Sequence, residues 1–417
     1  MSQHFDALET RAPLAREAAL MAALPAQIAH AKVHAPAFAQ LLHDVDAARV
    51  NSRAALAQLP VIRKYELLER QKASRAAGGS VFGGFSALGF GQAMPRVFAS
   101  PGTMYEPEGT RADYWRMARA MFAAGFRAGE LIHNSFSYHF TPAGSMMETG
   151  AHALGCTVFP GGTGQTEQQV AAMAELQPAG YIGTPSFLKI IVEKAAEQGV
   201  ALPSVRNALV SGEAFPPSLR DWMAERGIAA YQCYATADLG LIAYETSARE
   251  GLVLDEGVIV EIVRPGTGDP VPEGEVGELV VTSLNPDYPL IRFGTGDLSA
   301  ILPGQCTTGR TGQRIRGWMG RADQTTKVRG MFVHAAQVAD IVKRFPEVHK
   351  ARLVVSGEMA NDSMALHVET DQPSDALKSR IGQAIRDVTK LRGDVLWAAS
   401  GQLANDGKVI EDARSYK

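Results

Sequence analysis

Short apolar runs alternate with longer amphipathic segments between residues 96 and 226. The runs have the length of buried strands, and the segments between them repeat apolar residues at helical spacing. The predicted strands are residues 97–99, 131–132, 156–159, 180–182 and 207–210, and the predicted helices are residues 114–126, 145–154, 168–176, 186–198 and 216–226. This alternation predicts βαβ units around a largely parallel sheet.

The pattern changes after Tyr231. Residues 252–302 are rich in predicted strands, with turns at 265–266 and 272–274, which indicates an antiparallel or barrel-like subdomain. Residues after 330 predict a compact α+β unit, with helices at 335–344 and 374–389 and strands at 351–355 and 364–368. A glycine-punctuated segment, 317–330, separates the two patterns. The sequence therefore predicts an α/β protein with an N-terminal domain over 1–322 and a small C-terminal domain over 323–417.

Composition excludes several classes of protein. The chain has 417 residues, of which 46% are hydrophobic and 20% charged, the balance of an ordinary globular protein. Its net charge of −3 argues against a nucleic-acid partner. No apolar run approaches the roughly 18 residues of a membrane-spanning helix. Three widely spaced cysteines, Cys156, Cys233 and Cys306, form no disulfide framework, so a reducing, cytoplasmic location is predicted.

Three short motifs carry candidate chemistry, and each also has a purely structural interpretation. Ser100-Pro101-Gly102-Thr103 follows a predicted strand and precedes a predicted helix, where free backbone N–H groups can hold a phosphate. Asp297, in Thr295-Gly296-Asp297, can accept two ribose hydroxyls or simply cap a turn. The Asn405-Asp406-Gly407 turn presents Lys408, which is either functional or an exposed lysine beside a turn. A serine-hydrolase elbow and a His-Glu-X-X-His zinc motif are both missing from the sequence.

Ten segments occur in an order that resembles the AMP-forming acyl- and aryl-CoA ligases of the adenylate-forming superfamily, in the phenylacetate–CoA ligase-like branch. They are Leu59-Pro60-Val61-Ile62-Arg63-Lys64, the loop 100–103, residues 134–144, residues 155–164, Gly183-Thr184-Pro185, Ser211-Gly212-Glu213-Ala214, residues 234–238, residues 294–297, residues 320–330 and Gly407-Lys408.

The resemblance implies a two-step reaction. A carboxylate attacks the α-phosphate of ATP to give an acyl-adenylate and pyrophosphate, and the thiolate of coenzyme A then displaces AMP to form a thioester. Lys408 matches the lysine that bridges carboxylate and phosphate in the first step. In the family the C-terminal domain swings between the two steps, and Asp323 matches its hinge.

The resemblance also implies the site residues. The ATP site would use Ser100, Gly102 and Thr103 in the phosphate loop, Gly212, Glu213, Ala214 and Tyr234 around the adenine, Thr236 near the phosphates, and Asp297 with Arg321 at the ribose. Asp238 would be catalytic through Mg²⁺, which prefers such oxygen ligands. The acyl pocket would be lined by Phe136, Tyr138, Phe140, Ala143, Gly144, Gly183 and Thr184, which suits an aromatic or medium-sized apolar acid.

The phosphate loop departs from the family pattern. Met104, Tyr105 and Glu106 replace a hydroxyl residue, a glycine and a lysine, and Asp238 replaces a glutamate. Glu106 and Glu108 carry the wrong sign to hold a triphosphate. Two alternatives therefore stay open: an adenylating enzyme that loads a carrier-protein thiol, and a nucleotide- or acyl-CoA-binding protein without catalysis. The oligomeric state is also open, although homodimers are common in the branch.

Overall fold

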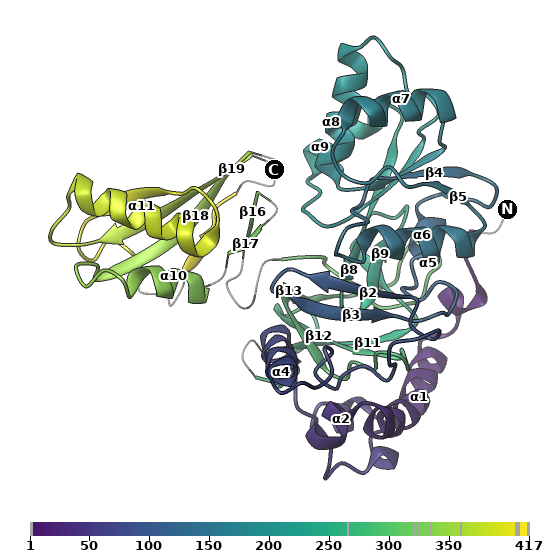
Figure 1. Cartoon of the computed structure of the whole chain (residues 1–417). Helices are drawn as coiled ribbons and strands as arrows, with labels where there is room; N and C mark the ends of the chain where they lie inside the picture. Colours follow the sequence, from purple (N-terminus) through teal and green to yellow (C-terminus); the bar gives the residue numbers. More distant parts are fainter. Residues whose placement is uncertain are drawn as a thin grey trace. The chain divides into compact units, whose positions relative to one another are not determined.

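The computed structural model describes residues 3–264, 267–319, 322, 326–329, 331–333, 335–358, 361–404 and 409–414. The chain forms two compact units, Met1–Gly320 and Arg321–Lys417 (Figure 1). The predicted site residues Arg321, Asp323 and Lys408 lie outside the described residues.

A nine-stranded mixed sheet forms the centre of the first unit. Its parallel part contains, in spatial order, β5 (Thr157–Phe159), β4 (Leu131–Asn134), β6 (Gly180–Gly183), β7 (Asn207–Val210) and β8 (Ala229–Thr236). The antiparallel part continues through β9 (Gly240–Glu245), β10 (Leu252–Leu254), β15 (Arg314–Ile315) and β14 (Ile301–Leu302). The predicted α/β organisation is confirmed.

Helices cover both faces of the parallel part. The three helices α7 (Thr166–Leu176), α8 (Pro185–Glu197) and α9 (Pro217–Ala224) lie on one face, whereas α5 (Ala118–Ala123) and α6 (Ala143–Leu154) lie on the other (Figure 1). The connection from β4 to β5 runs through α6, and the connection from β6 to β7 runs through α8. The neighbouring strands β4 and β6 therefore send their following helices to opposite faces, the arrangement in which open α/β sheets bind ligands at the carboxyl ends of the strands.

A second sheet joins the N-terminal helices to the later strands. Its order is β1 (Ile62–Arg63), β13 (Phe293–Ser299), β12 (Gly277–Ser283) and β11 (Val258–Val263). One apolar core spans this sheet and the helices beside it, including Leu24, Phe38 and Phe293. The elements before and after β1 are α1 (Pro13–His34), α2 (Pro36–Leu41), α3 (Arg53–Leu56) and α4 (Lys64–Ala76), with two 3-10 turns at Ala7–Thr10 and Ala47–Arg49.

Arg292 fastens the segment before β1 to this sheet. It is 1% exposed and donates to Glu261 on β11 at 3.0 and 3.1 Å. The same guanidinium donates to the backbone carbonyls of Ala57, Leu59 and Gly268. A single buried side chain therefore ties three segments that are distant in sequence.

Three sequence predictions need correction. The strand-rich region divides between two sheets, because β10 and β14 join the nine-stranded sheet instead of a separate barrel. The helix predicted at 114–126 is only Ala118–Ala123, because the Asp113 carboxylate accepts from the N–H groups of Met117 and Ala118 and caps the helix there. The 100–103 loop does not precede a helix: it joins β2 (Arg96–Ser100) to the antiparallel β3 (Met104–Glu108).

The second unit is a small α+β structure with its own core. Its four-stranded sheet has the order β20 (Asp394–Ala398), β19 (Asn361–Glu369), β18 (Lys350–Glu358) and β21 (Ile410–Asp412). The helices α10 (Ala335–Val342) and α11 (Asp375–Thr389) pack against it, and β16 (Thr326–Val328) pairs with β17 (Met331–Val333). No helix in the described part of the chain has the length and apolar character of a membrane span.

Candidate active site

The carboxyl ends of β4, β6 and β7 bring three of the predicted site segments to one edge of the sheet. Residues 134–144 follow β4, Gly183-Thr184 closes β6, and Ser211 to Ala214 follow β7. Because β4 pairs with β6 and β6 pairs with β7, these loops are neighbours in space. Open α/β sheets bind ligands in this position, at the point where the helices change face.

Hydrogen bonds order the loop after β4. Asn134 is fully buried, and its amide donates to the Tyr138 hydroxyl at 2.8 Å and to the Gly144 carbonyl at 2.9 Å. The Tyr138 hydroxyl in turn donates to Glu148 at 2.7 Å. Burial, and then Glu148, raise the pKa of Tyr138, so its hydroxyl keeps its proton. A tyrosine ring is thereby fixed at the crevice between β4 and β6.

Two glycines lie where a side chain has no room. A Cβ on Gly144 would be 2.7 Å from the Ser137 carbonyl oxygen, and one on Gly183 would be 2.1 Å from the Ser135 hydroxyl. Phe136 is 8% exposed, and Ala143 and Thr184 are half-buried beside these glycines in sequence. Phe140 differs from the other predicted acyl residues, since its side chain is 81% exposed and only its carbonyl is engaged, accepting from Ala99 N–H at 2.7 Å.

The predicted adenine segment is an exposed turn. Gly212 has φ +84°, a conformation that favours glycine. The exposed Glu213 accepts from the Ser186 N–H at 2.7 Å, and so caps the first turn of α8. Ala214 is half-buried next to Glu213. Glu213 therefore has a structural role at the start of α8, in addition to its predicted contact with a nucleotide.

Asp297 is held from both sides. It lies on β13 and is 9% exposed. The Tyr234 hydroxyl, from β8, donates to one carboxylate oxygen at 2.6 Å, and the Trp318 indole N–H donates to the other at 3.0 Å. Trp318 itself is 41% exposed and is positioned by backbone bonding of Met319 to Leu298 on β13. A carboxylate fixed in this way is of the type that the sequence analysis predicts as an acceptor for ribose hydroxyls.

The phosphate loop is the turn of a β-hairpin. Gly102 and Thr103 have φ +96° and +60°, and Gly102 is exposed. Ser100 is 6% exposed, and its hydroxyl does not face outward but donates to Glu106 at 2.5 Å. The Ser100 hydroxyl is taken up by the buried Glu106 carboxyl. The exposed backbone of the turn is therefore the part of this loop that a ligand can reach.

Glu106 and Glu108 do not present negative charge to solvent. They are 0% and 1% exposed. Burial, and then the charge of Asp238, raise the pKa of Glu106 to about 8, so this carboxyl is neutral at physiological pH. Glu108 accepts from Arg96 at 2.6 Å, from the Trp115 indole at 2.6 Å and from Ser145 at 2.8 Å. Burial and these partners keep both carboxyl groups off the surface of the hairpin, and the expectation that they weaken its hold on a triphosphate stays a prediction.

Asp238 faces a lysine rather than solvent. Its side chain is fully buried, and one carboxylate oxygen accepts from Lys64 Nζ at 2.7 Å. The other oxygen is buried and has no hydrogen-bond partner among the described residues, and the same is true of one Glu106 oxygen. Thr236 accepts from the Leu239 N–H at 3.2 Å and so stabilises the turn that carries Asp238.

Sequence reasoning assigned no role to Lys64, Trp318 or the buried carboxyl of Glu106. Lys64 stands in a segment that carries the family resemblance and begins α4 directly after β1, at the end of a buried strand. Trp318 follows Gly317 in a glycine-punctuated segment. The sequence gives only a weak signal for these residues, because their roles depend on burial and on contacts made by the fold, such as that of Lys64 with Asp238.

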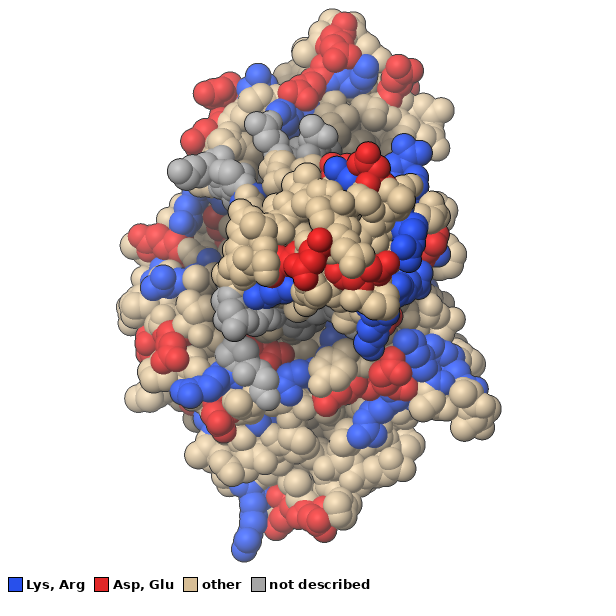
Figure 2. Space-filling model, turned by 90° about the vertical axis from the view of Figure 1, so that its left-hand side faces the viewer, with Lys and Arg blue, Asp and Glu red and all other residues tan. Residues whose placement is uncertain are grey.

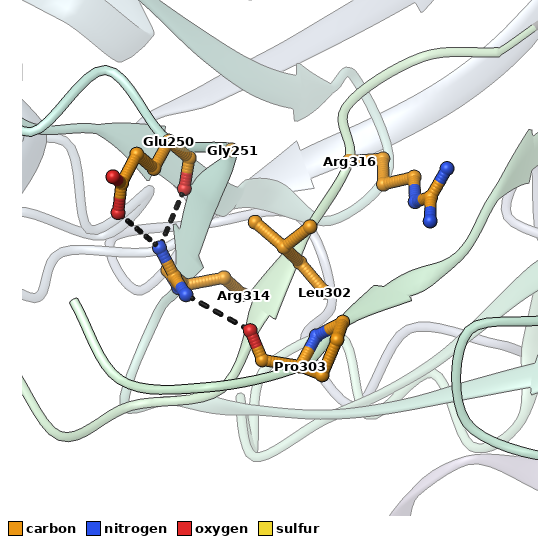
Figure 3. A pocket seen from close by; sticks show the side chains of 6 residues that line it. All are labelled: Glu250, Gly251, Leu302, Pro303, Arg314 and Arg316. Atoms are coloured by element: carbon orange, nitrogen blue, oxygen red, sulfur yellow. Dashed lines mark hydrogen bonds and ion pairs between the residues drawn. The ribbon is translucent and has the colours of Figure 1, made fainter.

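A separate hollow of about 570 Å³ lies at the edge formed by β10, β14 and β15 (Figure 3). Arg314 in its wall donates to the Glu250 carbonyl and carboxylate and to the Pro303 carbonyl, while Arg316 lies beyond Leu302. The lining contains no predicted site residue. Figure 2 shows acidic and basic side chains together over the face that it draws, in keeping with the small net charge.

Known proteins match this chain in sequence and in fold. The family described as AMP-binding enzyme matches residues 113–285. A phenylacetate–coenzyme A ligase of Thermus thermophilus is 33% identical over 298 residues, which are 67% of this chain and 66% of that protein. The corresponding ligase of Escherichia coli is 30% identical over 296 residues, which are 67% of each chain.

A crystal structure of 2-hydroxyisobutyryl-CoA ligase, in complex with 2-HIB-AMP and CoA, superimposes with a TM-score of 0.81. It covers 100% of this chain and 93% of its own, at 23% identity, and so supports the fold. The chain spans about two-thirds of the length of the curated relatives that it matches. By these matches the chain belongs to the phenylacetate–coenzyme A ligase family of AMP-binding enzymes.

Proposed function

We propose that this chain is an AMP-forming acid–CoA ligase. It activates an aromatic or medium-sized apolar carboxylic acid with ATP to an acyl-adenylate and pyrophosphate, and transfers the acyl group to coenzyme A with release of AMP. Phenylacetate, the acid in the names of the matched ligases, is the first substrate to test.

The geometry of Asp297 is the observation that carries this proposal. Tyr234 and Trp318 each donate to one oxygen of its carboxylate, which fixes the orientation of this side chain. A carboxylate in a fixed orientation suits the hydroxyls of a ribose, and the exposed turn at Gly212 and Glu213 follows β7, the strand next to the β8 strand that carries Tyr234. The acid would lie in the crevice after β4 and β6, where Tyr138, Gly144 and Gly183 form the wall.

The side chains near the phosphate loop supply charge for the first step. In that step a carboxylate oxygen of the acid bonds to the α-phosphorus and the bond to pyrophosphate breaks. Positive charge stabilises the transferring phosphoryl group. Lys64, which pairs with Asp238 and has a third of its side chain exposed, is a cation of this unit. From the family resemblance we assign the same task to Lys408, the hinge to Asp323 and a ribose contact to Arg321.

Mg²⁺ fits Asp238 as a single protein ligand. One oxygen of Asp238 is buried without a partner, while Lys64 occupies the other. Mg²⁺ commonly binds one or two carboxylates together with substrate phosphates and water. The ion would supply Lewis-acid polarisation of the phosphate oxygens, and Asp238 would hold it beside the hairpin turn.

Pyrophosphate release from ATP and Mg²⁺ tests the proposal. Phenylacetate, other aryl acids, indolyl acids and short acyl acids are each assayed with and without coenzyme A. The proposal expects acid-dependent release that coenzyme A sustains beyond one equivalent, and near-complete loss of adenylation in Lys408→Ala. Release that stalls near one equivalent with coenzyme A points to a carrier-protein thiol, and AMP binding without release for any acid points to a non-catalytic binding protein.

The remaining assignments are proposals of the same kind. The partners would be a small-molecule acid and a second copy of the chain, without nucleic acid or membrane. The three cysteines are all buried and unpaired, which suits a cytoplasmic location.

A further inference from the structure

A buried glutamine of α7 binds the loop that follows β5. Gln169 is 3% exposed. Its amide nitrogen donates to the carbonyls of Gly161, Gly162 and Gly164 at 3.1, 2.8 and 3.2 Å. Carbonyl oxygens only accept hydrogen bonds, so these contacts fix which end of the amide faces the loop. One side chain therefore holds three residues of the segment that joins β5 to α7.

The other end of the Gln169 amide faces His133 on β4. The amide oxygen of Gln169 is hydrogen-bonded to the Nε2 atom of His133. Because the amide nitrogen is turned towards the loop, the oxygen is the acceptor in this bond, and His133 Nε2 carries the proton. Burial lowers the pKa of His133, so its ring is neutral at physiological pH. His133 therefore acts as an uncharged donor to Gln169.

Packing fixes the position of the His133 ring. In the strand register it lies directly opposite Phe159 on β5 and Tyr181 on β6, with ring centroids 5.2 and 6.3 Å away. The loop also approaches closely: a Cβ on Gly161 would be 2.5 Å from Gln169 Oε1 and 2.8 Å from His133 Nε2. The two hydrogen-bonded side chains are thus confined by neighbouring strands and by the loop that they bind.

The loop after β5 is bonded in turn to the site loop after β4. The Gly162 N–H donates to the Asn134 carbonyl at 3.1 Å. The side chain of Asn134 donates to the Tyr138 hydroxyl and to the Gly144 carbonyl. Because β5 and β4 pair in parallel, both loops leave the sheet at the same carboxyl edge. Displacement of the loop after β5 would therefore remove a bond from the residue that orients Tyr138.

We propose that Gln169 and His133 are positioning residues for the acid, because they hold the loop after β5 against the site loop after β4. The inference rests on the proposed function, in which the acid lies beside Tyr138. Both side chains are buried, and they act on the acid through the two loops. Loss of this anchor should weaken binding of the acid more than binding of ATP, since Asp297 lies on a strand of the other sheet.

The test compares Gln169→Leu and Gln169→Glu with the matched control Gln168→Leu in the full chain. Gln168 is the exposed neighbour of Gln169 on the same helix. The glutamate variant keeps the shape of the side chain but presents oxygens to the three carbonyls in place of a donor. A third variant, Gly161→Ala, displaces the same pair of side chains and removes no polar group.

Two measurements are made on each protein. Initial rates of pyrophosphate release are recorded against ATP and against phenylacetate, or against the acid of the panel that gives the highest rate. Hydrogen exchange is followed by mass spectrometry over peptide 159–168, together with thermal unfolding.

We expect KM for the acid to rise about tenfold in the three anchor variants, the equivalent of about one lost hydrogen bond. The KM for ATP and kcat should stay close to the wild-type values, whereas partial unfolding would lower kcat alone. Exchange over 159–168 should quicken in these variants and not in Gln168→Leu. Combining Gly161→Ala with Gln169→Leu should add little, because both changes break the same contact.

An unchanged KM for the acid in both Gln169 variants, an equal rise in KM for ATP, or the same changes in Gln168→Leu would each overturn the inference. A wild-type chain that releases pyrophosphate with no acid refutes the proposed function instead. In either case, wild-type exchange over 159–168 in the Gln169 variants would show that this side chain does not hold the loop.

Discussion

Replacement of Glu106 by glutamine should remove part of the pH dependence of the free energy of unfolding. Glu106 is fully buried, accepts from Ser100 at 2.5 Å through one oxygen, and has no partner for the other. Burial, and then Asp238, raise its pKa from 4.5 to about 8 in the folded chain. Between these two values the folded state holds a proton that the unfolded state has released.

The sign follows from this difference in bound protons. Stability that depends on the neutral Glu106 is fully present below about pH 4.5, and it is lost progressively as pH rises towards about 8. Each pH unit inside this window costs about 1.4 kcal/mol. The wild type should therefore lose about 3 kcal/mol between pH 4.5 and pH 7 relative to Glu106→Gln, whose amide has no such titration.

Urea unfolding at pH 5, 6, 7 and 8 measures the effect for wild type, Glu106→Gln and the exposed control Glu175→Gln. The quantity compared is the difference in unfolding free energy between each variant and the wild type, which cancels the titration of groups that do not interact with Glu106. The unfolding free energy of Glu106→Gln should rise relative to that of the wild type as pH increases. The unfolding free energy of Glu175→Gln should change with pH as that of the wild type does. Parallel curves for all three proteins would refute a neutral Glu106 in the fold.

Two further predictions concern single contacts. Tyr234→Phe removes a donor to Asp297. AMP should therefore bind about 5- to 10-fold more weakly by titration calorimetry, in keeping with about 1 to 1.5 kcal/mol for one hydrogen bond. Unchanged affinity would contradict a role for the Tyr234–Asp297 contact in nucleotide binding. Arg292→Met leaves Glu261 buried without its partner, which should cost about 3–5 kcal/mol in urea unfolding. The double variant Arg292→Met with Glu261→Met should recover much of that loss, and an equally unstable double variant would contradict the explanation.

Local pattern was sufficient for most of the elements. The alternation of apolar runs and amphipathic segments predicted β4 to β7 and α6 to α9 within a few residues, because strands and helices bury their faces with different periods. It predicted too long a helix at α5, because the spacing of apolar residues does not show that the Asp113 carboxylate binds the N–H groups of Met117 and Ala118, or that the Trp115 indole donates to Glu108. The pattern also assigned the residues of β10 to a barrel-like subdomain, although β10 pairs with β9 and β15 in the nine-stranded sheet.

The sequence by itself determined the α/β fold class, the family and the identity of the candidate chemistry at Asp297, Asp238 and Lys408. Only the tertiary structure decided the charge at the phosphate hairpin, where Glu106 is buried and neutral and Lys64, 174 residues from Asp238, supplies the cation. A residue type fixes which charges are available, but its charge state and its partner depend on burial and on neighbours that the fold brings from distant parts of the chain.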